Sequence, residues 1–146
     1  MQSSYHEVNL CSRRCCCILI LTIGMVSGCS VKTDGPEVTL EKANILSDRG
    51  RFEDAVAFYS DAAASLPNRG DIYYRRGICY ENLNLLPKAL EDYSMCLEVQ
   101  SQHLDALNNK GVVLAKLERY QEAAEVFTDL LRHQPNNVLA LRNRGL

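Results

Sequence analysis

The sequence predicts an all-α fold built from antiparallel helix pairs, with about three complete repeats and a partial fourth. The first observation is a fixed period, because residues 70–103 align with residues 104–137 and equivalent residues lie 34 positions apart. The second is that equivalent positions hold the same kind of residue, as in Gly77 and Gly111, Ala89 and Ala123, and Tyr93 and Phe127. A period of this length is typical of stacked helical units.

The period extends in both directions and divides residues 36–146 into three complete repeats and one partial repeat. We number them repeat 1 (36–69), repeat 2 (70–103), repeat 3 (104–137) and repeat 4 (138–146), and we count places 1 to 34 within each. Each complete repeat is expected to hold a helix A, a tight turn and a helix B. The predicted helices cover residues 37–48, 53–65, 71–83, 87–99, 105–117 and 121–133.

Small residues recur where the two helices of a repeat are expected to approach each other. Place 8 on helix A is small in every repeat, as Ala43, Gly77, Gly111 and Gly145. On helix B, place 20 is always alanine and place 24 carries a ring, as Tyr59, Tyr93 and Phe127. Glycine inside a helix costs about 1 kcal/mol relative to alanine, so glycines in register indicate a steric requirement.

This pattern resembles the tetratricopeptide repeat (TPR) in its helix–turn–helix form, its period and its alternation of small and large residues. The resemblance covers residues 36–146 and implies a right-handed superhelical solenoid whose concave groove binds a protein or peptide. In that family the groove is lined by places 2, 5, 9 and 12 of each helix A. The predicted groove residues here are therefore Glu37, Leu40, Asn44, Ser47, Asp71, Tyr74, Ile78, Glu81, Asp105, Asn108, Val112 and Ala115.

The predicted groove is apolar at its centre, at Tyr74, Ile78 and Val112, and acidic along one edge. That composition suits an extended or helical peptide with apolar anchors and basic flanks. TPR co-chaperones instead hold a C-terminal carboxylate with a clamp of lysine, asparagine and arginine. Asp105 and Leu40 stand at two places where that clamp has lysine, so the sequence disfavours a chaperone tail as the ligand.

Residues 1–28 have the features of a secretory signal peptide. Arg13 and Arg14 precede an apolar run from Cys15 to Val26, and small residues close the run. The run is shorter than the roughly 20 residues that a helix needs to span a bilayer. A cleaved signal is therefore favoured over a spanning anchor.

The end of this run, formed by Val26, Ser27, Gly28 and Cys29, resembles the bacterial lipobox. In that family a diacylglycerol is attached to the cysteine thiol, and the peptide before the cysteine is removed. The resemblance implies that Cys29 is the lipid attachment site and that residues 29–35 form the lipidated cysteine and a short linker. The protein would then be anchored to a membrane of the bacterial cell envelope, outside the cytoplasm. The alternative is a signal cleaved near Gly28, with Cys29 incidental.

The sequence holds no recognisable catalytic constellation or metal-ligand spacing. We therefore predict that the chain is not an enzyme and has no cofactor apart from the covalent lipid on Cys29. His103 and His133 are interpreted as surface or capping residues, and Cys79 and Cys96 as small core residues rather than a disulfide. A formal net charge of −2 argues against a nucleic-acid partner.

Charged residues on the predicted helices are interpreted as solvated. Glu91 and Asp92 are assigned to an exposed face of helix B. At place 7, where TPRs often have leucine, the aliphatic stems are expected to cover the core while the charges reach water. The residues at place 7 are Lys42, Arg76, Lys110 and Arg144.

Together, these observations favour a membrane-anchored scaffold or assembly factor that binds a protein or peptide partner in the bacterial cell envelope. Two alternatives remain open. The chain is either an accessory subunit that delivers substrates to an envelope enzyme, or a cytosolic TPR adaptor if its N-terminus is not a true signal.

Repeat 4 holds most of a helix A and no helix B. We expect Val138, Leu139 and Leu141 to cover helix B of repeat 3, and residues 142–146 to fray, because so short a helix is marginal by itself. Repeat arrays usually end in a polar cap. The chain is therefore expected to be truncated relative to a longer array, or to form a dimer through this end.

Overall fold

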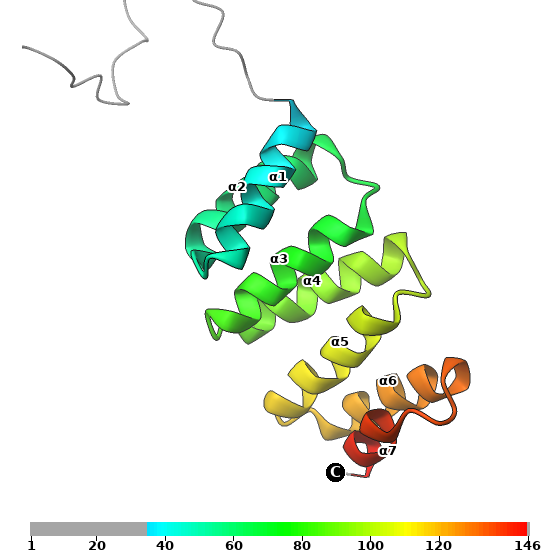
Figure 1. The fold of residues 1–146 in the computed structure, drawn as a ribbon. Coiled ribbons are helices and arrows are strands. Elements are labelled where there is room, and N and C mark those ends of the chain that lie inside the picture. Colours follow the sequence, from blue (N-terminus) through cyan, green and yellow to red (C-terminus); the bar gives the residue numbers. More distant parts are fainter. Residues whose placement is uncertain (1–34, 146) are drawn as a thin grey trace, which may run out of the picture. The chain divides into compact units, whose positions relative to one another are not determined.

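The structure, a computed structural model, describes residues 35–145, which fold into seven helices without a strand (Figure 1). The helices are α1 (Pro36–Asp48), α2 (Phe52–Ser65), α3 (Gly70–Asn82), α4 (Leu86–Val99), α5 (Leu104–Lys116), α6 (Tyr120–His133) and α7 (Val138–Arg144). The longest of them have 14 residues, and no helix in the described part of the chain is long and apolar enough to cross a bilayer. The all-α prediction is confirmed.

The six helices of the complete repeats agree closely with their predicted ranges. Each begins one residue earlier than predicted, and α3 and α5 also end one residue earlier. Place 34 acts as the N-cap of the next helix A: the side chains of His103 and Asn137 each accept a hydrogen bond from a backbone N–H of the first turn. Proline stands in the first turn of α1 and of α4, where its missing N–H costs nothing.

The turn between helices A and B has one residue in the left-handed region in every complete repeat. These residues are Gly50, Asn84 and Glu118, with φ angles of 73°, 57° and 61°. All three occupy place 15. Glycine and asparagine adopt this conformation readily, whereas glutamate does so only against steric strain.

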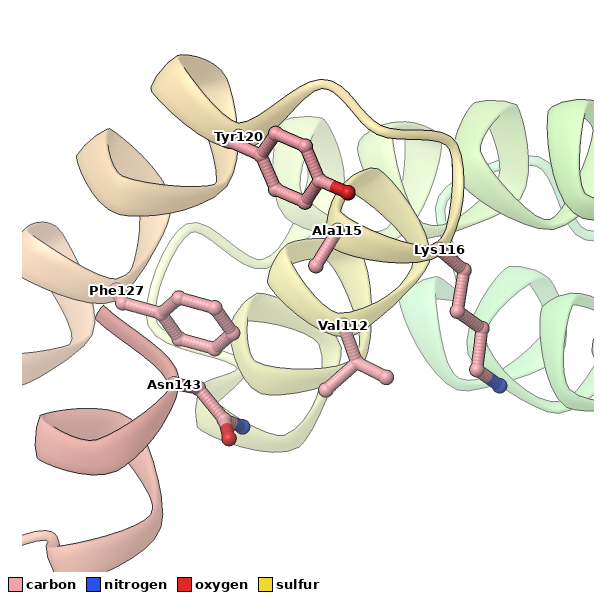
Figure 2. A pocket seen from close by; sticks show the side chains of 6 residues that line it. All are labelled: Val112, Ala115, Lys116, Tyr120, Phe127 and Asn143. Carbon is pink, nitrogen blue, oxygen red and sulfur yellow. The ribbon is translucent and has the colours of Figure 1, made fainter. Parts of the chain in front are cut away.

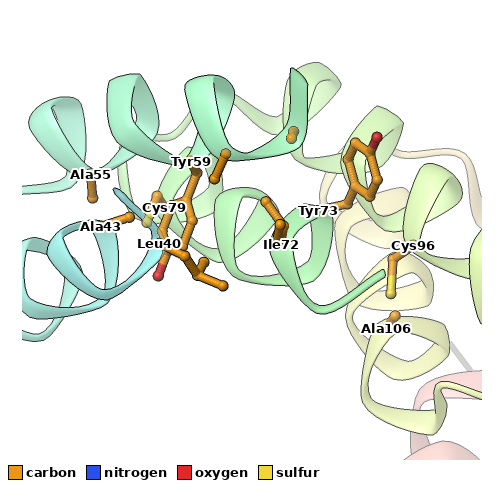
Figure 3. Packing of buried hydrophobic residues seen from close by; sticks show 11 residues of the cluster. Leu40, Ala43, Ala55, Tyr59, Ile72, Tyr73, Cys79, Cys96 and Ala106 are labelled. Atoms are coloured by element: carbon orange, nitrogen blue, oxygen red, sulfur yellow. The ribbon is translucent and has the colours of Figure 1, made fainter. Parts of the chain in front are cut away.

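Helices pack mainly against the helices that precede and follow them in the chain. The largest core cluster has members from each of the helices α1, α2, α3, α4 and α5. Leu40, Tyr59 and Ile72 are among its buried residues (Figure 3). A second cluster around Leu107, Phe127 and Leu130 joins α5, α6 and α7. The core is therefore a continuous stack, which is the arrangement that repeats give when each buries its apolar faces on its neighbours.

The close approach predicted at place 8 is present. A Cβ atom added at Gly77 would lie 2.8 Å from the ring of Tyr93, and one added at Gly111 would lie 2.7 Å from the ring of Phe127. Real Cβ atoms do not come so close to a ring. In repeats 2 and 3, the ring at place 24 thus excludes a side chain at place 8.

The interpretation of Asp92 and Arg76 as solvated charges is wrong. Asp92 is 2% exposed and accepts two hydrogen bonds from the Arg76 guanidinium, at 2.6 and 2.8 Å. Arg76 also donates to Ser60 of α2 at 3.1 Å and lies between the rings of Tyr73 and Tyr80. A buried carboxylate is tolerated only with a close partner, and the fork of arginine supplies it here.

The expected packing of α7 is also wrong in its residues. Val138, Leu139 and Leu141 are exposed, and Ala140 is the residue of α7 that is buried against α6. The Asn137 cap fixes the start of the helix and turns Ala140 toward the core. The small alanine brings α7 close to α6, and the larger residues at places 1, 2 and 4 point outward.

Candidate functional site

The predicted groove residues all lie on α1, α3 and α5, the helices A of the three complete repeats. At the N-terminal end, the acidic edge is already partly neutralised. Arg69 donates to Asp71 at 2.7 and 3.0 Å and to Glu37 at 3.1 Å. The Arg69 guanidinium lowers the pKa of Asp71 below its ordinary value. Asp105 on α5 is exposed and makes no ion pair within residues 35–145.

The prediction that Leu40 lines the groove is wrong, because its side chain is only 6% exposed and belongs to the core cluster of α1 and α2. Asn44, one turn later, is half-buried and accepts a hydrogen bond from the Tyr59 hydroxyl at 2.8 Å. Burial raises the pKa of Tyr59 to about 12, so this phenol remains a donor at neutral pH. In repeat 1, both of these predicted groove residues are therefore engaged within the repeat itself.

Aromatic residues form the middle of the site. The half-buried ring of Tyr74 lies 4.5 Å from the ring of His103 and 6.0 Å from the ring of Tyr93. Burial raises the pKa of Tyr74 above its ordinary value. Ile78 packs against the same cluster from the next turn of α3. Tyr74 and Ile78 thus form a partly apolar surface, which also carries the Tyr74 hydroxyl and the His103 imidazole.

A polar contact links α3, α4 and α5 beside this cluster. The Glu81 carboxylate accepts hydrogen bonds from the Tyr93 hydroxyl at 2.9 Å and from Lys116 Nζ at 2.7 Å. Asn108 is half-buried on α5 and donates to the neighbouring Asn109 side chain at 3.3 Å. Glu81 is therefore already engaged by two partners within the protein.

Val112 and Ala115 line a pocket of about 490 Å³ between α5, α6 and α7. Figure 2 shows both side chains near the ring of Phe127 and the side chain of Asn143, while Lys116 extends away from them. Tyr120, which is 50% exposed, completes the lining. The pocket thus has an apolar floor and a polar rim. A second pocket, of about 380 Å³ between α1 and α2, holds none of the predicted residues.

Several residues of the site were not predicted. Arg69 and His103 stand at place 34, which sequence reasoning treated as a turn. Tyr120, Phe127 and Asn143 belong to a helix B and to repeat 4, so a rule confined to places 2, 5, 9 and 12 excludes them. In repeat 3, the ring at place 24 has no polar partner. This difference from repeat 2 could have revealed the pocket.

The histidine and cysteine interpretations agree with the structure. His103 is a capping residue whose Nδ1 accepts the Ala106 N–H at 3.1 Å. Cys79 and Cys96 are buried free thiols. Among residues 35–145, no group of three or more His, Cys, Asp and Glu side chains is arranged to hold a metal ion. Residues 1–34, which include Cys29 and the predicted signal peptide, lie outside the described residues.

Comparison with known proteins identifies the repeats. The tetratricopeptide repeat pattern matches residues 70–103 and again residues 104–137. The chain carries two TPR repeats. Its helix pairs have the fold of a TPR solenoid, because solved TPR domains are among the structures that resemble it.

One similar curated protein is Hsp70-Hsp90 organizing protein 3 of Arabidopsis thaliana, which is 31% identical over 97 residues. The match covers 66% of this chain and only 17% of that protein. Among structures, the TPR domain of Arabidopsis OM64 has 25% identity and a TM-score of 0.69, over 75% of this chain and 91% of that one.

A second structure is the first TPR of Spaghetti (RPAP3) bound to the Hsp90 peptide SRMEEVD, with 21% identity and a TM-score of 0.70. The match covers 80% of this chain and 93% of that one. At this identity the likeness concerns the fold.

Proposed function

We propose that this chain is a protein-binding scaffold whose TPR solenoid holds an extended or helical segment of a partner along α1, α3 and α5. The observation that carries the proposal is that the predicted apolar groove residues Tyr74, Ile78 and Val112 are all half-buried; Tyr74 and Ile78 pack in one cluster, and Val112 lines the pocket with Ala115. Half-buried aromatic and aliphatic residues in a concave surface are the usual anchors of protein interfaces. The peptide-bound RPAP3 domain supports the same use of the fold.

The partner is expected to differ from a chaperone tail. Leu40 is buried and Asp105 presents a carboxylate, so two lysine places of the co-chaperone clamp have no cation. A negatively charged chain end would be repelled by the Asp105 carboxylate. A basic segment of the partner suits this end of α5 better, because it would pair with that carboxylate.

Partner capture by the chain tests this proposal. The double variant Tyr74→Ala with Val112→Asp removes one anchor and places a charge in the other, so it should reduce capture at least tenfold. The matched control is Glu91→Ala with Glu125→Ala, two exposed residues at place 22 of helix B. Circular dichroism confirms that both variants are folded. Equal capture by the groove variant, with loss in the control, would move the binding site to the helix B surface.

We also propose that Cys29 carries a lipid that anchors the scaffold to a membrane of the bacterial cell envelope. Support comes from the sequence, in which Cys29 follows the small residues that close the apolar run. The linker from residue 30 to residue 35 reaches at most about 20 Å when extended, so the anchor would hold the repeats close to the membrane surface.

Incorporation of labelled lipid tests the anchor. The wild-type chain should take up label and fractionate with membranes, and Cys29→Ser should lose both properties. Cys11→Ser is the matched control, because it removes a thiol from the same leader without touching the lipobox. Membrane retention and unchanged size in Cys29→Ser would refute the lipid anchor. A wild-type chain that takes up no label and does not fractionate with membranes would favour a cytosolic adaptor.

A further inference from the structure

We propose that the pocket between α5, α6 and α7 is a subsite for one aromatic side chain of the partner, next to an acidic side chain of the same segment. The pocket is lined by Val112, Ala115, Lys116, Tyr120, Phe127 and Asn143. This inference rests on the proposed function and adds to it the chemistry of the residue that the groove selects.

The previous repeat shows what normally fills this place. In repeat 2 the ring at place 24 is Tyr93, whose hydroxyl donates to the Glu81 carboxylate at place 12. In repeat 3 the same two places hold Phe127 and Ala115. Repeat 3 therefore lacks both the phenol hydroxyl and the carboxylate. Their loss leaves an open space in repeat 3 beside Phe127, the ring equivalent to Tyr93.

The walls of the space favour a ring as its occupant. Phe127 is fully buried beneath the pocket, Val112 and Ala115 add aliphatic surface, and the Tyr120 ring stands half-exposed at the side. Aromatic rings gain from edge and offset contacts with other rings beyond the burial of their area. The volume of about 490 Å³ admits such a side chain together with part of its backbone.

The charges around the pocket favour an acidic neighbour for that ring. The lining contains the ammonium of Lys116 and the amide of Asn143, but no carboxylate. Arg142 and Arg144 flank Asn143 on α7, are exposed, and form no ion pair within residues 35–145. Lys116 already binds one carboxylate, that of Glu81, at 2.7 Å. A carboxylate brought by the partner would meet no carboxylate in the pocket lining, and it could share Lys116 with Glu81 or pair with the exposed arginines of α7.

A basic segment near Asp105 and an acidic residue near α7 are compatible in one partner. Asp105 lies in the first turn of α5, whereas Ala115 and Lys116 lie in its last turn. The two charges of the partner would be separated by the length of a 13-residue helix. The pocket thereby fixes which end of the bound segment lies at repeat 4.

Peptide binding by the full chain in detergent solution tests the subsite. The probes are fluorescein-labelled, acetylated and amidated peptides of sequence Gly-Ser-Asp-Tyr-Asp-Ser-Gly, with variants that replace Tyr by Ala or both Asp by Asn. Fluorescence anisotropy should show at least tenfold weaker binding when Tyr is replaced and at least threefold weaker binding when both Asp are replaced. A parent peptide that does not bind at 1 mM, or binds no better than the Ala peptide, would overturn the proposal.

The matched variant introduces two residues of repeat 2 at the equivalent places of repeat 3. Ala115→Glu with Phe127→Tyr should fill the pocket with the pair that repeat 2 already accommodates, and binding of the parent peptide should fall at least tenfold. Gln102→Glu adds the same charge at an exposed site outside the pocket and should change binding by less than twofold. Unchanged binding by the double variant would overturn the subsite. A peptide that binds only with a free C-terminal carboxylate would overturn the acidic side chain as its source of charge.

The subsite and the proposed function can fail separately. Tyr74 lies outside the pocket, so Tyr74→Ala reports on the groove alone. If Tyr74→Ala weakens partner capture while the double variant in repeat 3 leaves it unchanged, the groove stands and the subsite falls. If neither variant affects capture and the helix B control does, the proposed function falls.

Discussion

At the scale of single residues, Gly111 and Phe127 show how the side chain at one place limits the residue type at another. The ring at place 24 occupies the volume in which a side chain at place 8 would begin. Gly77 and Tyr93 repeat the relation in the preceding repeat. In repeat 1, Ala43 faces Tyr59, and both side chains are completely buried. In repeats 2 and 3, helix A therefore has a residue of lower helix propensity at place 8, whereas repeat 1 accommodates alanine beside its ring.

Gly111→Leu should destabilise the domain by about 1–3 kcal/mol or more, because the new side chain must displace the Phe127 ring from a packed core. Thermal unfolding followed by circular dichroism measures the effect. Gly145→Ala is the control, since a Cβ there would come no closer than 3.5 Å to its neighbours. An unchanged melting temperature in Gly111→Leu would show that place 8 is not a close-contact site.

The two cysteines of repeat 2 should be unreactive in the folded protein. Burial raises the pKa of the Cys96 thiol from 9.0 to about 11 and also raises the pKa of Cys79, so little thiolate is present at neutral pH. Alkylation with iodoacetamide at pH 8, mapped by mass spectrometry, should modify them only after denaturant is added. Because the folded pKa of Cys96 is raised, the contribution of this thiol to stability is complete below pH 9.0 and is lost as pH rises through about 11. Rapid labelling of Cys96 in the native chain would contradict its burial.

Residue-level prediction failed where two distant residues cooperate. When each residue is considered alone, the sequence predicts that Asp92 is a surface acid and that Arg76 is a solvated base. They are 16 positions apart and meet only after helices α3 and α4 pair. A single sequence shows periodic spacing but does not show which charges desolvate together. Leu40 was misplaced for a similar reason, because its place in the repeat faces the groove elsewhere but the core here.

At the scale of elements, the turn between helices A and B repeats its conformation with different residues. Place 15 is in the left-handed region in all three complete repeats, and it holds Gly50, Asn84 and Glu118 in turn. The left-handed conformation costs an ordinary L-residue roughly 1–2 kcal/mol. The third repeat therefore carries strain in its turn that the first repeat avoids.

Glu118→Gly should raise the stability of the domain by about 1 kcal/mol, less the small entropic cost of glycine in the unfolded chain. The melting temperature should increase by a few degrees. Gly50→Ala is the reciprocal variant and should lower it, because a Cβ atom is introduced at φ 73°. A Glu118→Gly variant less stable than wild type would mean that the Glu118 side chain contributes contacts that outweigh the strain.

Helix boundaries were predictable to within one residue because apolar spacing, glycine and proline mark them locally. For the helices A, the error of one residue at the start has a physical cause. Sequence reasoning took place 2, often an acid, as the first helical residue, whereas the cap lies at place 34 and the helix begins at place 1. His103 caps α5 through its Nδ1 atom, a role that its position in a turn suggested but did not specify.

At the scale of the whole molecule, stability is distributed along a stack in which each helix contacts its sequence neighbours. Such arrays behave as a sum of repeat stabilities and interface terms. The helix α7 has seven residues and buries only Ala140, so its attachment to α6 is weak. The candidate subsite depends on this helix, because Asn143 forms part of its wall.

Native-state hydrogen exchange should therefore show that α7 opens first. The amides of residues 141–144 should exchange much faster than those of α3 and α5, which are packed on both sides. Binding of the aspartate- and tyrosine-containing peptide should slow exchange in α7, if it occupies the pocket. Strong protection of α7 in the free, dilute chain would contradict the weak attachment.

The candidate site was predictable only in part, for reasons that act at this scale. Tyr74, Ile78 and Val112 follow from a repeating rule, and the structure places them on α3 and α5 as expected. The pocket arises instead from departures in repeat 3, where Phe127 and Ala115 replace a hydrogen-bonded pair. The prediction uses only the places that the repeats have in common. It therefore cannot indicate a pocket that exists because repeat 3 lacks the hydrogen-bonded pair of repeat 2.

Site-specific photo-crosslinking tests the central claim, that the face of the helices A holds the partner. A benzophenone amino acid is introduced at Asn108 on α5 in one variant and at Glu125 on the exposed surface of α6 in the other. After irradiation of native cells, we expect a partner adduct from position 108 and none from position 125. An adduct formed from position 125 alone, or equally from both positions, would contradict the groove as the binding site.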